Sequence, residues 1–287
     1  MTTAGPGRRG VRQFVVLALI AALCGTGIAL YFDERDSRQQ TRELGARPTG
    51  DWVELDITAQ EVRPATQELT LAVVPIPHGT LAGGPPDAPV FTRDVDIAAT
   101  ALTKPFQARA GEPAELQLIP VGMSGGTPSD YPFDHYTVSV GWSASAGGSA
   151  VPVALTFTDS DPFFVVRPKN TGASGATARL DSRVSRSRST FILAWFMIAA
   201  MWALALAVLG GAEVLIRKRQ GLVWPALGWM AATLFALVGL RNAAPGSPPI
   251  GSLMDYIAFF WAEGIIAASL TCTAAFGIRH ERRLMEE

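Results

Sequence analysis

Four apolar runs constrain this chain more than any other feature, because each is long enough to cross a bilayer as a helix. The first run covers residues 14–32, and the others cover 191–216, 222–240 and 256–278. A span needs roughly 20 apolar residues, and a helix satisfies its own backbone hydrogen bonds in lipid. The sequence therefore predicts one transmembrane helix before a long polar segment and three clustered after it.

The positions of arginine and lysine predict which side of the membrane each end faces. Basic residues flank three apolar ends: Arg8, Arg9 and Arg12; Arg217, Lys218 and Arg219; Arg279, Arg282 and Arg283. Such flanks favour the cytoplasm, so we expect both termini there, in a multi-pass protein of the cell (inner) membrane. Arg183, Arg186 and Arg188 lie on the opposite side. A translocated folded domain weakens the rule enough to accept them.

The first run could instead be a cleaved signal peptide, or a lipoprotein signal ending at Cys24. It is long for a signal sequence, and no small-x-small site follows Leu30. Leu23 stands where a lipoprotein signal needs a small residue. We expect an uncleaved anchor.

The segment between the first two spans predicts a β-rich domain outside the membrane. Residues 33–50 are polar and favour a linker or short helical stalk, whereas apolar and polar residues alternate from Asp51 onward. Period-two alternation, about seven short strands and Gly/Pro-rich turns are typical of an antiparallel sandwich or barrel. The domain contains no cysteine, because Cys24 and Cys272 fall within predicted spans, so its core must hold it together without disulfides.

Composition and residue spacing point away from several functional classes. The net charge is −1, and the outer segment has no basic face with interleaved aromatics, so no nucleic-acid partner is expected. The histidines His78, His135 and His280 have no cysteine or carboxylate at ligand spacing, so we predict no metal site. We also expect no cofactor and no catalytic residues, since no nucleophile, phosphate loop or carboxylate pair stands out.

The sharpest string in the outer segment is Tyr131-Pro132-Phe133-Asp134, followed by His135 and Tyr136. Pro132 restricts the backbone of Tyr131 to an extended conformation. Asp134 can accept hydrogen bonds from nearby backbone amides and close a turn, and Phe133 can plug the end of the domain. A buried structural corner is one interpretation. The alternatives are a surface that couples the domain to the membrane helices and, less favoured, an Asp134–His135 catalytic pair.

A second string joins the last two spans and begins at Arg241 (RNAAPGSPPIG), with Asp255 where the next helix starts. Three prolines and two glycines predict a stiff loop, and Arg241 and Asp255 should lie at one depth. A salt bridge between them is the simple interpretation. A docking surface for the outer domain or a partner is the functional one.

Glu263 lies about two turns inside the last span, roughly 10 Å from Tyr256 along the axis. A carboxylate in lipid is costly and usually faces the bundle interior. We expect polar pairing with Arg241, Thr233 or a carbonyl, or alternatively a proton or ligand site. Glu213 is expected to pair with Arg217 one turn on.

The chain resembles an uncharacterised actinobacterial four-span membrane family catalogued as domain of unknown function 4436. The resemblance rests on YPFDHY at 131–136, on residues 185–190 and on the loop from Arg241 to Asp255 with the following FFW. It would cover nearly the whole chain. It implies this architecture and no activity.

Together these features predict an α+β membrane protein with an extracytoplasmic antiparallel β-sandwich inserted between transmembrane helix 1 and a three-helix transmembrane bundle. The predicted segments are a cytoplasmic N-terminus 1–13, span 14–32, linker 33–50, sandwich 51–188, spans 191–216 and 222–240, outer loop 241–255, span 256–278 and cytoplasmic tail 279–287.

The expected role is a non-enzymatic accessory or scaffold protein of the cell envelope that acts through its sandwich. Its expected partners are the lipid bilayer and an envelope or membrane protein, with a homo-oligomer as an alternative. Tyr131, Pro132, Phe133, Asp134, Arg241 and Asp255 form the candidate coupling surface. The alternatives are a transport or channel component that uses Glu263, and a small-ligand sensor.

Overall fold

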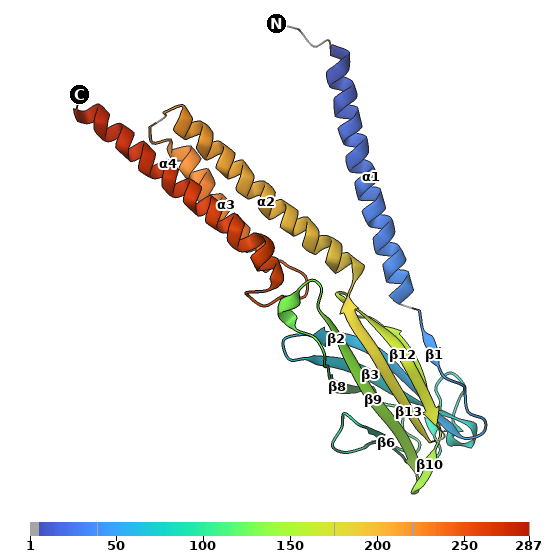
Figure 1. Ribbon diagram of the computed structural model, residues 1–287. Coiled ribbons are helices and arrows are strands. Elements are labelled where there is room, and N and C mark those ends of the chain that lie inside the picture. The colour runs from blue at the N-terminus through green and yellow to red at the C-terminus, as the bar shows by residue number, and fades with distance from the viewer. Residues whose placement is uncertain (1–5, 39, 175, 220, 287) are drawn as a thin grey trace.

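The computed structural model describes residues 6–38, 40–174, 176–219 and 221–286, and it shows an α+β protein whose helices and sheets occupy opposite ends (Figure 1). Residues 1–5 of the expected N-terminal segment lie outside the described residues. The first residues of α1 (Pro6–Arg38) and the last residues of α4 (Phe260–Glu286) lie far from the sheets.

Three helices in the described residues are long and apolar enough to cross a membrane, which is compatible with a membrane protein. They are α2 (Arg188–Arg217), α3 (Trp224–Asn242), and α4 (Phe260–Glu286) with the π-helical turn η3 (Asp255–Phe259) that leads into it. The predicted run 14–32 lies within α1 (Pro6–Arg38), and its role as a fourth span stays a prediction.

Two sheets and a short ribbon make up the β-domain, residues 42–186. The first sheet has the order β1 (Arg42–Leu44), β11 (Val153–Asp159), β2 (Trp52–Arg63), β3 (Glu68–His78), β8 (Gln117–Gly122). The second has the order β12 (Phe164–Ser174), β13 (Thr177–Arg186), β9 (His135–Ala146), β6 (Val95–Ala99), β7 (Phe106–Ala108), with β10 (Ser149–Val151) paired to β9. The ribbon is β4 (Ala82–Gly83) with β5 (Val90–Phe91).

Alternating side chains from both sheets bury into one hydrophobic core. Trp142, Tyr136, Phe164, Leu55 and Ile57 are among its largest fully enclosed members. The period-two pattern of β9, buried at every second residue from Tyr136 to Ala146, explains why this strand can lie at the centre of the second sheet. Burial of such side chains is the main source of stability for a domain without disulfides.

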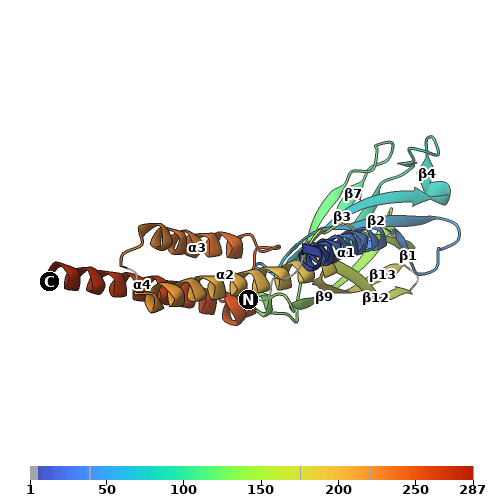
Figure 2. The same ribbon diagram turned by 90° about the horizontal axis from the view of Figure 1, so that it is seen from above.

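The helices have a separate hydrophobic core of their own. It includes Met201, Ala205 and Val208 of α2, Met230 of α3 and Ile266 of α4. Trp202 Nε1 also donates to the Ile257 carbonyl at 3.2 Å, which satisfies an acceptor in the π-helical turn. The helices α2, α3 and α4 therefore form one bundle, seen from above in Figure 2.

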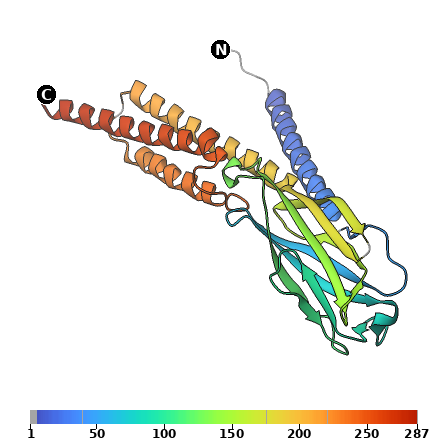
Figure 3. The ribbon, with the colours of Figure 1, turned by 60° about the horizontal axis from the view of Figure 1, so that its bottom comes forward.

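Helix α1 leaves the β-domain in a different direction from the bundle, as Figures 1 and 3 show. Its large apolar side chains, such as Phe14 and Leu17, are largely exposed. Within the described part of the chain, α1 contacts the start of α2 through Asp33 and Glu34, near the C-terminal end of α1.

Three features of the sheets differ from the predicted pattern. β2 and β11 pair in parallel, whereas the prediction was antiparallel throughout; a crossover through the intervening strands joins them. In β8, Ile119 and Val121 face the core and Leu118 is exposed, although Leu116 and Leu118 are the apolar residues that alternate with the polar Glu115 and Gln117, so the alternation predicts the wrong face of this strand. Pro120 is tolerated because β8 is an edge strand.

The third difference is β13, a strand that the alternation in the sequence does not predict. Its buried residues Ala178, Leu180, Ser182 and Val184 alternate with polar ones. Arginines and a buried serine obscured this period-two signal. The strand lies between β12 and β9, and one residue after it the chain enters α2.

Leu180→Ala should lower the free energy of unfolding by about 3 kcal/mol, because it leaves a cavity in the shared core. Urea unfolding of the detergent-solubilised protein, followed by proteolysis, would measure the loss. Arg179→Ala on the exposed face of the same strand, which removes an exposed pair with Asp181, is the control and should change it by less than about 1 kcal/mol. Equal effects from both variants would contradict the placement of β13 in the core.

Candidate functional site

The turn Tyr131–Asp134 lies where the β-domain meets the helices. It follows the 3-10 turn η2 (Pro128–Asp130), and its Tyr131–Pro132 peptide bond is cis. Tyr131 is fully buried and belongs to the hydrophobic core of the helices, not to that of the sheets. Phe133 is half-exposed and packs edge-on against Phe191 of α2, with ring centroids 5.4 Å apart. The turn therefore contacts the bundle, and Phe133 does not plug the domain.

A buried salt bridge joins this turn to the end of β13. Arg186 donates from Nε to Asp134 Oδ1 at 2.9 Å and from Nη2 to Asp134 Oδ2 at 3.0 Å. The two side chains are 3% and 0% exposed. Tyr136 donates a third hydrogen bond to Asp134 Oδ2 at 3.0 Å. Asp134 thus binds side chains and does not close its turn on backbone amides as predicted.

The Arg186 guanidinium also lies between two aromatic rings. Its central carbon is 4.1 Å from the Phe164 ring centroid and 4.8 Å from that of Tyr131, so it has cation–π contacts with both cores. Nη1 has no hydrogen-bond partner in the described residues and faces Gly246 of the α3–α4 loop. A Cβ at position 246 would overlap Nη1, which explains why glycine stands there.

Two tyrosines share this buried environment but differ in their hydrogen bonds. Burial raises the pKa of Tyr131 to about 12, with a further increase from the Asp134 charge, and it also raises the pKa of Tyr136. The Tyr131 hydroxyl has no partner in the described part of the chain, whereas that of Tyr136 binds Asp134. The nearby Arg186 and Arg241 charges oppose the increase at Tyr131.

The loop between α3 and α4 is closed by the expected pair. Arg241 donates from Nε and Nη2 to the Asp255 carboxylate at 2.8 Å and 2.7 Å, and both side chains are buried. Arg241 also donates to the carbonyls of Pro248 and Pro249, and the Gly251 amide donates to Asp255. The bonds hold the loop in a fixed shape beside Arg186.

The start of α2 is capped by groups from distant parts of the chain. The Ser187 hydroxyl accepts from the Thr190 amide at 3.1 Å, an ordinary N-cap. The Glu34 carboxylate of α1 accepts from the amides of Arg188 and Ser189 at 2.6 Å and 2.9 Å, and from the Ser189 hydroxyl. A carboxylate at a helix N-terminus is electrostatically favourable. α1 is thereby attached to the first turn of α2.

Glu263 is not paired as predicted. Arg241 is engaged with Asp255, and the Thr233 hydroxyl donates to the Trp229 carbonyl at 2.8 Å. Glu263 is half-buried and forms no hydrogen bond or ion pair within the described residues. Glu213, in contrast, does pair with Arg217 at 2.6 Å.

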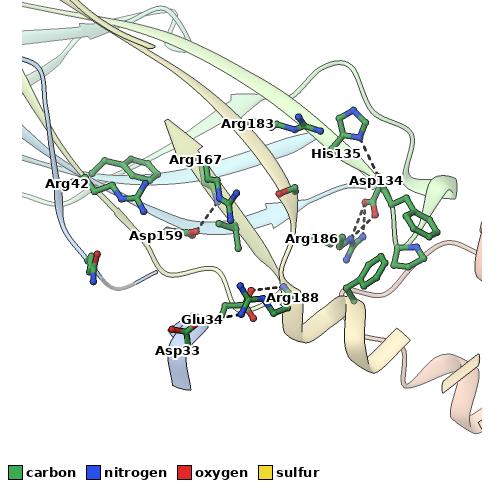
Figure 4. A pocket seen from close by; sticks show the side chains of 18 residues that line it. Asp33, Glu34, Arg42, Asp134, His135, Asp159, Arg167, Arg183, Arg186 and Arg188 are labelled. Carbon is green, nitrogen blue, oxygen red and sulfur yellow. Dashed lines mark hydrogen bonds and ion pairs between the residues drawn. The ribbon is translucent and has the colours of Figure 1, made fainter. Parts of the chain in front are cut away.

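A pocket of about 470 Å³ opens at this junction (Figure 4). Its wall comes from α1, the start of α2, the Tyr131–Asp134 turn and strands β1, β11, β12 and β13. Ten charged or histidine side chains are labelled around it: Asp33, Glu34, Arg42, Asp134, His135, Asp159, Arg167, Arg183, Arg186 and Arg188. Neither in this pocket nor elsewhere in the described residues do three His, Cys, Asp or Glu side chains gather as they would to hold a metal ion.

The structure therefore brings most of the candidate coupling residues into one region and leaves Glu263 apart. Arg186 connects them, whereas the sequence pattern indicates only a basic flank of α2 on the side that the charge rule disfavours. The available signal is that Arg186 continues the two-residue spacing of Ser182 and Val184, which are buried on one face of the strand. Glu34 falls in the segment that the sequence predicts to be a polar linker or short helical stalk. No local signal in the sequence identifies a cap supplied 154 residues away.

Asp134→Ala should lower the free energy of unfolding by about 3–5 kcal/mol, because it leaves the Arg186 charge buried without its partner. Thermal or urea unfolding in detergent would measure this change. Asp181→Ala removes an exposed pair with Arg179 and should lower it by less than about 1 kcal/mol. A loss of the same small size for both variants would mean that the buried pair does not join the two parts.

Tyr131→Phe should leave stability at neutral pH unchanged or slightly higher, because it removes an unpartnered hydroxyl. Tyr136→Phe removes a hydrogen bond to a carboxylate and should lower the free energy of unfolding by about 2 kcal/mol.

The stability of the parent protein and that of the Tyr131→Phe variant should differ at alkaline pH. The pKa of Tyr131 is raised in the folded protein. The contribution of Tyr131 to the free energy of unfolding is therefore fully present below a pH of about 10, and it is lost as the pH rises through about 12. Unfolding curves from pH 8 to 12 should fall less steeply for Tyr131→Phe than for the parent protein. Parallel curves would contradict this burial.

Comparison with protein families divides the chain at the same junction. No curated protein matches the chain. Residues 186–280, which hold the helical bundle, match the family described as Domain of unknown function (DUF8686). Residues 43–184, which form the β-domain, match the family described as Domain of unknown function (DUF4436). This is the family that the sequence resembles, but its match ends before the helical bundle.

Proposed function

We propose that this protein is a non-enzymatic accessory or scaffold protein of the cell envelope that holds its β-domain at a fixed orientation on the outer side of the cell membrane. In this proposal the two sheets form a sandwich, α2, α3 and α4 span the bilayer with α1, and both termini are cytoplasmic. The sandwich binds another envelope or membrane component.

One observation carries the proposal: the β-domain is joined to the bundle by a buried, charged connection and not by a flexible linker. β13 ends at Arg186 and α2 begins at Arg188. Arg186 binds Asp134, and Tyr131 enters the helical core. Because buried polar contacts tolerate few geometries, the domain and the helices should move as one body. Rigid presentation of a surface suits a scaffold.

The proposed topology is tested with single cysteines in a Cys24→Ser, Cys272→Ser background. Ser149→Cys in the β-domain should react with a membrane-impermeant maleimide in intact cells. Met285→Cys near the C-terminus should react only after permeabilisation. Both positions are solvent-exposed in the structure, so unequal labelling reports the membrane side. The reverse pattern would overturn the topology, and labelling of both in intact cells would overturn the membrane anchor.

The scaffold role is tested by crosslinking in native membranes and pull-down through a C-terminal tag. The parent protein should retain one stoichiometric envelope partner, and Phe133→Ala should lose it while remaining folded, because Phe133 packs on α2 without a buried charge. Asp181→Ala on the exposed face of β13 is the control. A partner retained equally by all three proteins would refute the coupling surface, and self-crosslinks alone would indicate a homo-oligomer.

A transport or channel component is the second candidate, and the unpaired Glu263 favours it. Three or four spans are few for a transporter, so this function also requires oligomerisation. If Glu263 carries a proton or ligand, Glu263→Gln should abolish flux in proteoliposomes while thermal stability stays within about 0.5 kcal/mol of the parent. Unchanged flux would exclude this role.

A further inference from the structure

Three arginines at the junction pocket form no ion pair within the described part of the chain. Arg42 of β1, Arg167 of β12 and Arg183 of β13 line the pocket, and all three are exposed to solvent. None lies within ion-pair distance of a carboxylate in the described residues. Their positions around the cavity are visible in Figure 4.

Two of these arginines are held opposite each other. Arg167 and Arg183 are direct cross-strand partners in the antiparallel β12–β13 pair, so their side chains share one face of the sheet. Like charges directly opposite each other destabilise a sheet. An anion bound between them would remove this repulsion, and arginine forms paired hydrogen bonds with phosphate oxygens.

The acidic groups around the same pocket already have partners. Asp33 pairs with Arg188 at 3.3 Å, and Glu34 caps α2. Asp134 binds Arg186, and Asp159 accepts from the Val166 amide at 2.8 Å. The pocket lining holds five arginines (Arg42, Arg167, Arg183, Arg186 and Arg188) and four carboxylates (Asp33, Glu34, Asp134 and Asp159), so its net charge is positive.

The pocket lies where α1 and α2 diverge. Glu34 ties α1 to the start of α2, and beyond this contact the two helices separate (Figures 1 and 3). Both carry large exposed apolar side chains close to the contact: Ile28, Tyr31 and Phe32 on α1, and Ile192, Trp195 and Phe196 on α2. In a bilayer, acyl chains would cover such surfaces, and their headgroups would lie at the level of the pocket.

We infer that this pocket binds the phosphate headgroup of an anionic phospholipid, with Arg42, Arg167 and Arg183 as its ligands and the acyl chains between α1 and α2. The volume of about 470 Å³ falls within the range of small-molecule sites, roughly 300–1,000 Å³. Basic pockets between transmembrane helices recognise lipid headgroups by the same pairing. The inference rests on the proposed placement of the helices in the membrane.

The test is native mass spectrometry of the full chain in detergent, titrated with phosphatidylglycerol or phosphatidylcholine. The parent protein should bind phosphatidylglycerol at least about tenfold more tightly than phosphatidylcholine. The affinity for phosphatidylglycerol should fall about a hundredfold when Arg42, Arg167 and Arg183 are replaced by glutamine, because each basic group near an anionic surface contributes about fivefold to binding. Replacement by lysine should retain part of the affinity.

The matched control replaces three exposed arginines outside this pocket, Arg63, Arg93 and Arg109, by glutamine and so removes the same net charge. It should bind phosphatidylglycerol like the parent. Equal losses in both triple variants, or no loss in either, would overturn the site. Circular dichroism must show both variants folded, and single Arg183→Gln, with an expected loss of about fivefold, replaces the triple variant if that one unfolds.

Competition separates a lipid from a free anion. Glycerol phosphate and inorganic phosphate at millimolar concentration should not displace phosphatidylglycerol; displacement would show a site for soluble anions and overturn the lipid assignment. The cysteine labelling described above tests the membrane topology separately. Correct labelling without lipid selectivity would refute this inference alone, whereas incorrect labelling would refute the proposed function first.

Discussion

The buried pair of Arg186 and Asp134 is the contact on which the relation between the sheets and the helices depends. Removing two charges from water is costly, and the cost is offset only when geometry and further hydrogen bonds are good. Here the carboxylate receives two nitrogens of Arg186 and the Tyr136 hydroxyl, and the guanidinium lies on two aromatic rings. Few other arrangements of the domain and the bundle could satisfy all of these groups.

The segments that meet at this pair are themselves held rigidly. The α3–α4 loop is held by Arg241 and Asp255 and approaches Arg186 so closely at Gly246 that no side chain fits there. The first turn of α2 is held by Ser187 and Glu34. The junction is thus built from elements that are already rigid, so a change in one should be felt by the others.

Much of this architecture was accessible from the sequence because its signals are local. Long apolar runs predicted helices, and the alternation in segments such as Tyr136–Trp142 predicted strands. Pairings between distant segments were not accessible. Nothing local reveals that β2 and β11 run parallel, or that β8 turns Ile119 inward and Leu118 outward. Tyr131 and Asp134 stood out as unusual residues, but Arg186 did not, because an arginine beside a membrane span is normally read as a solvated flank.

The cap that Glu34 places on α2 has a consequence for how the chain is made. Glu34 is synthesised 154 residues before Arg188, and the whole β-domain lies between them. The helix start can be completed only after that domain has folded and brought the two ends together, because closure of so long a loop is unfavourable without it. The contact between α1 and the first turn of α2 is therefore conditional on a folded β-domain.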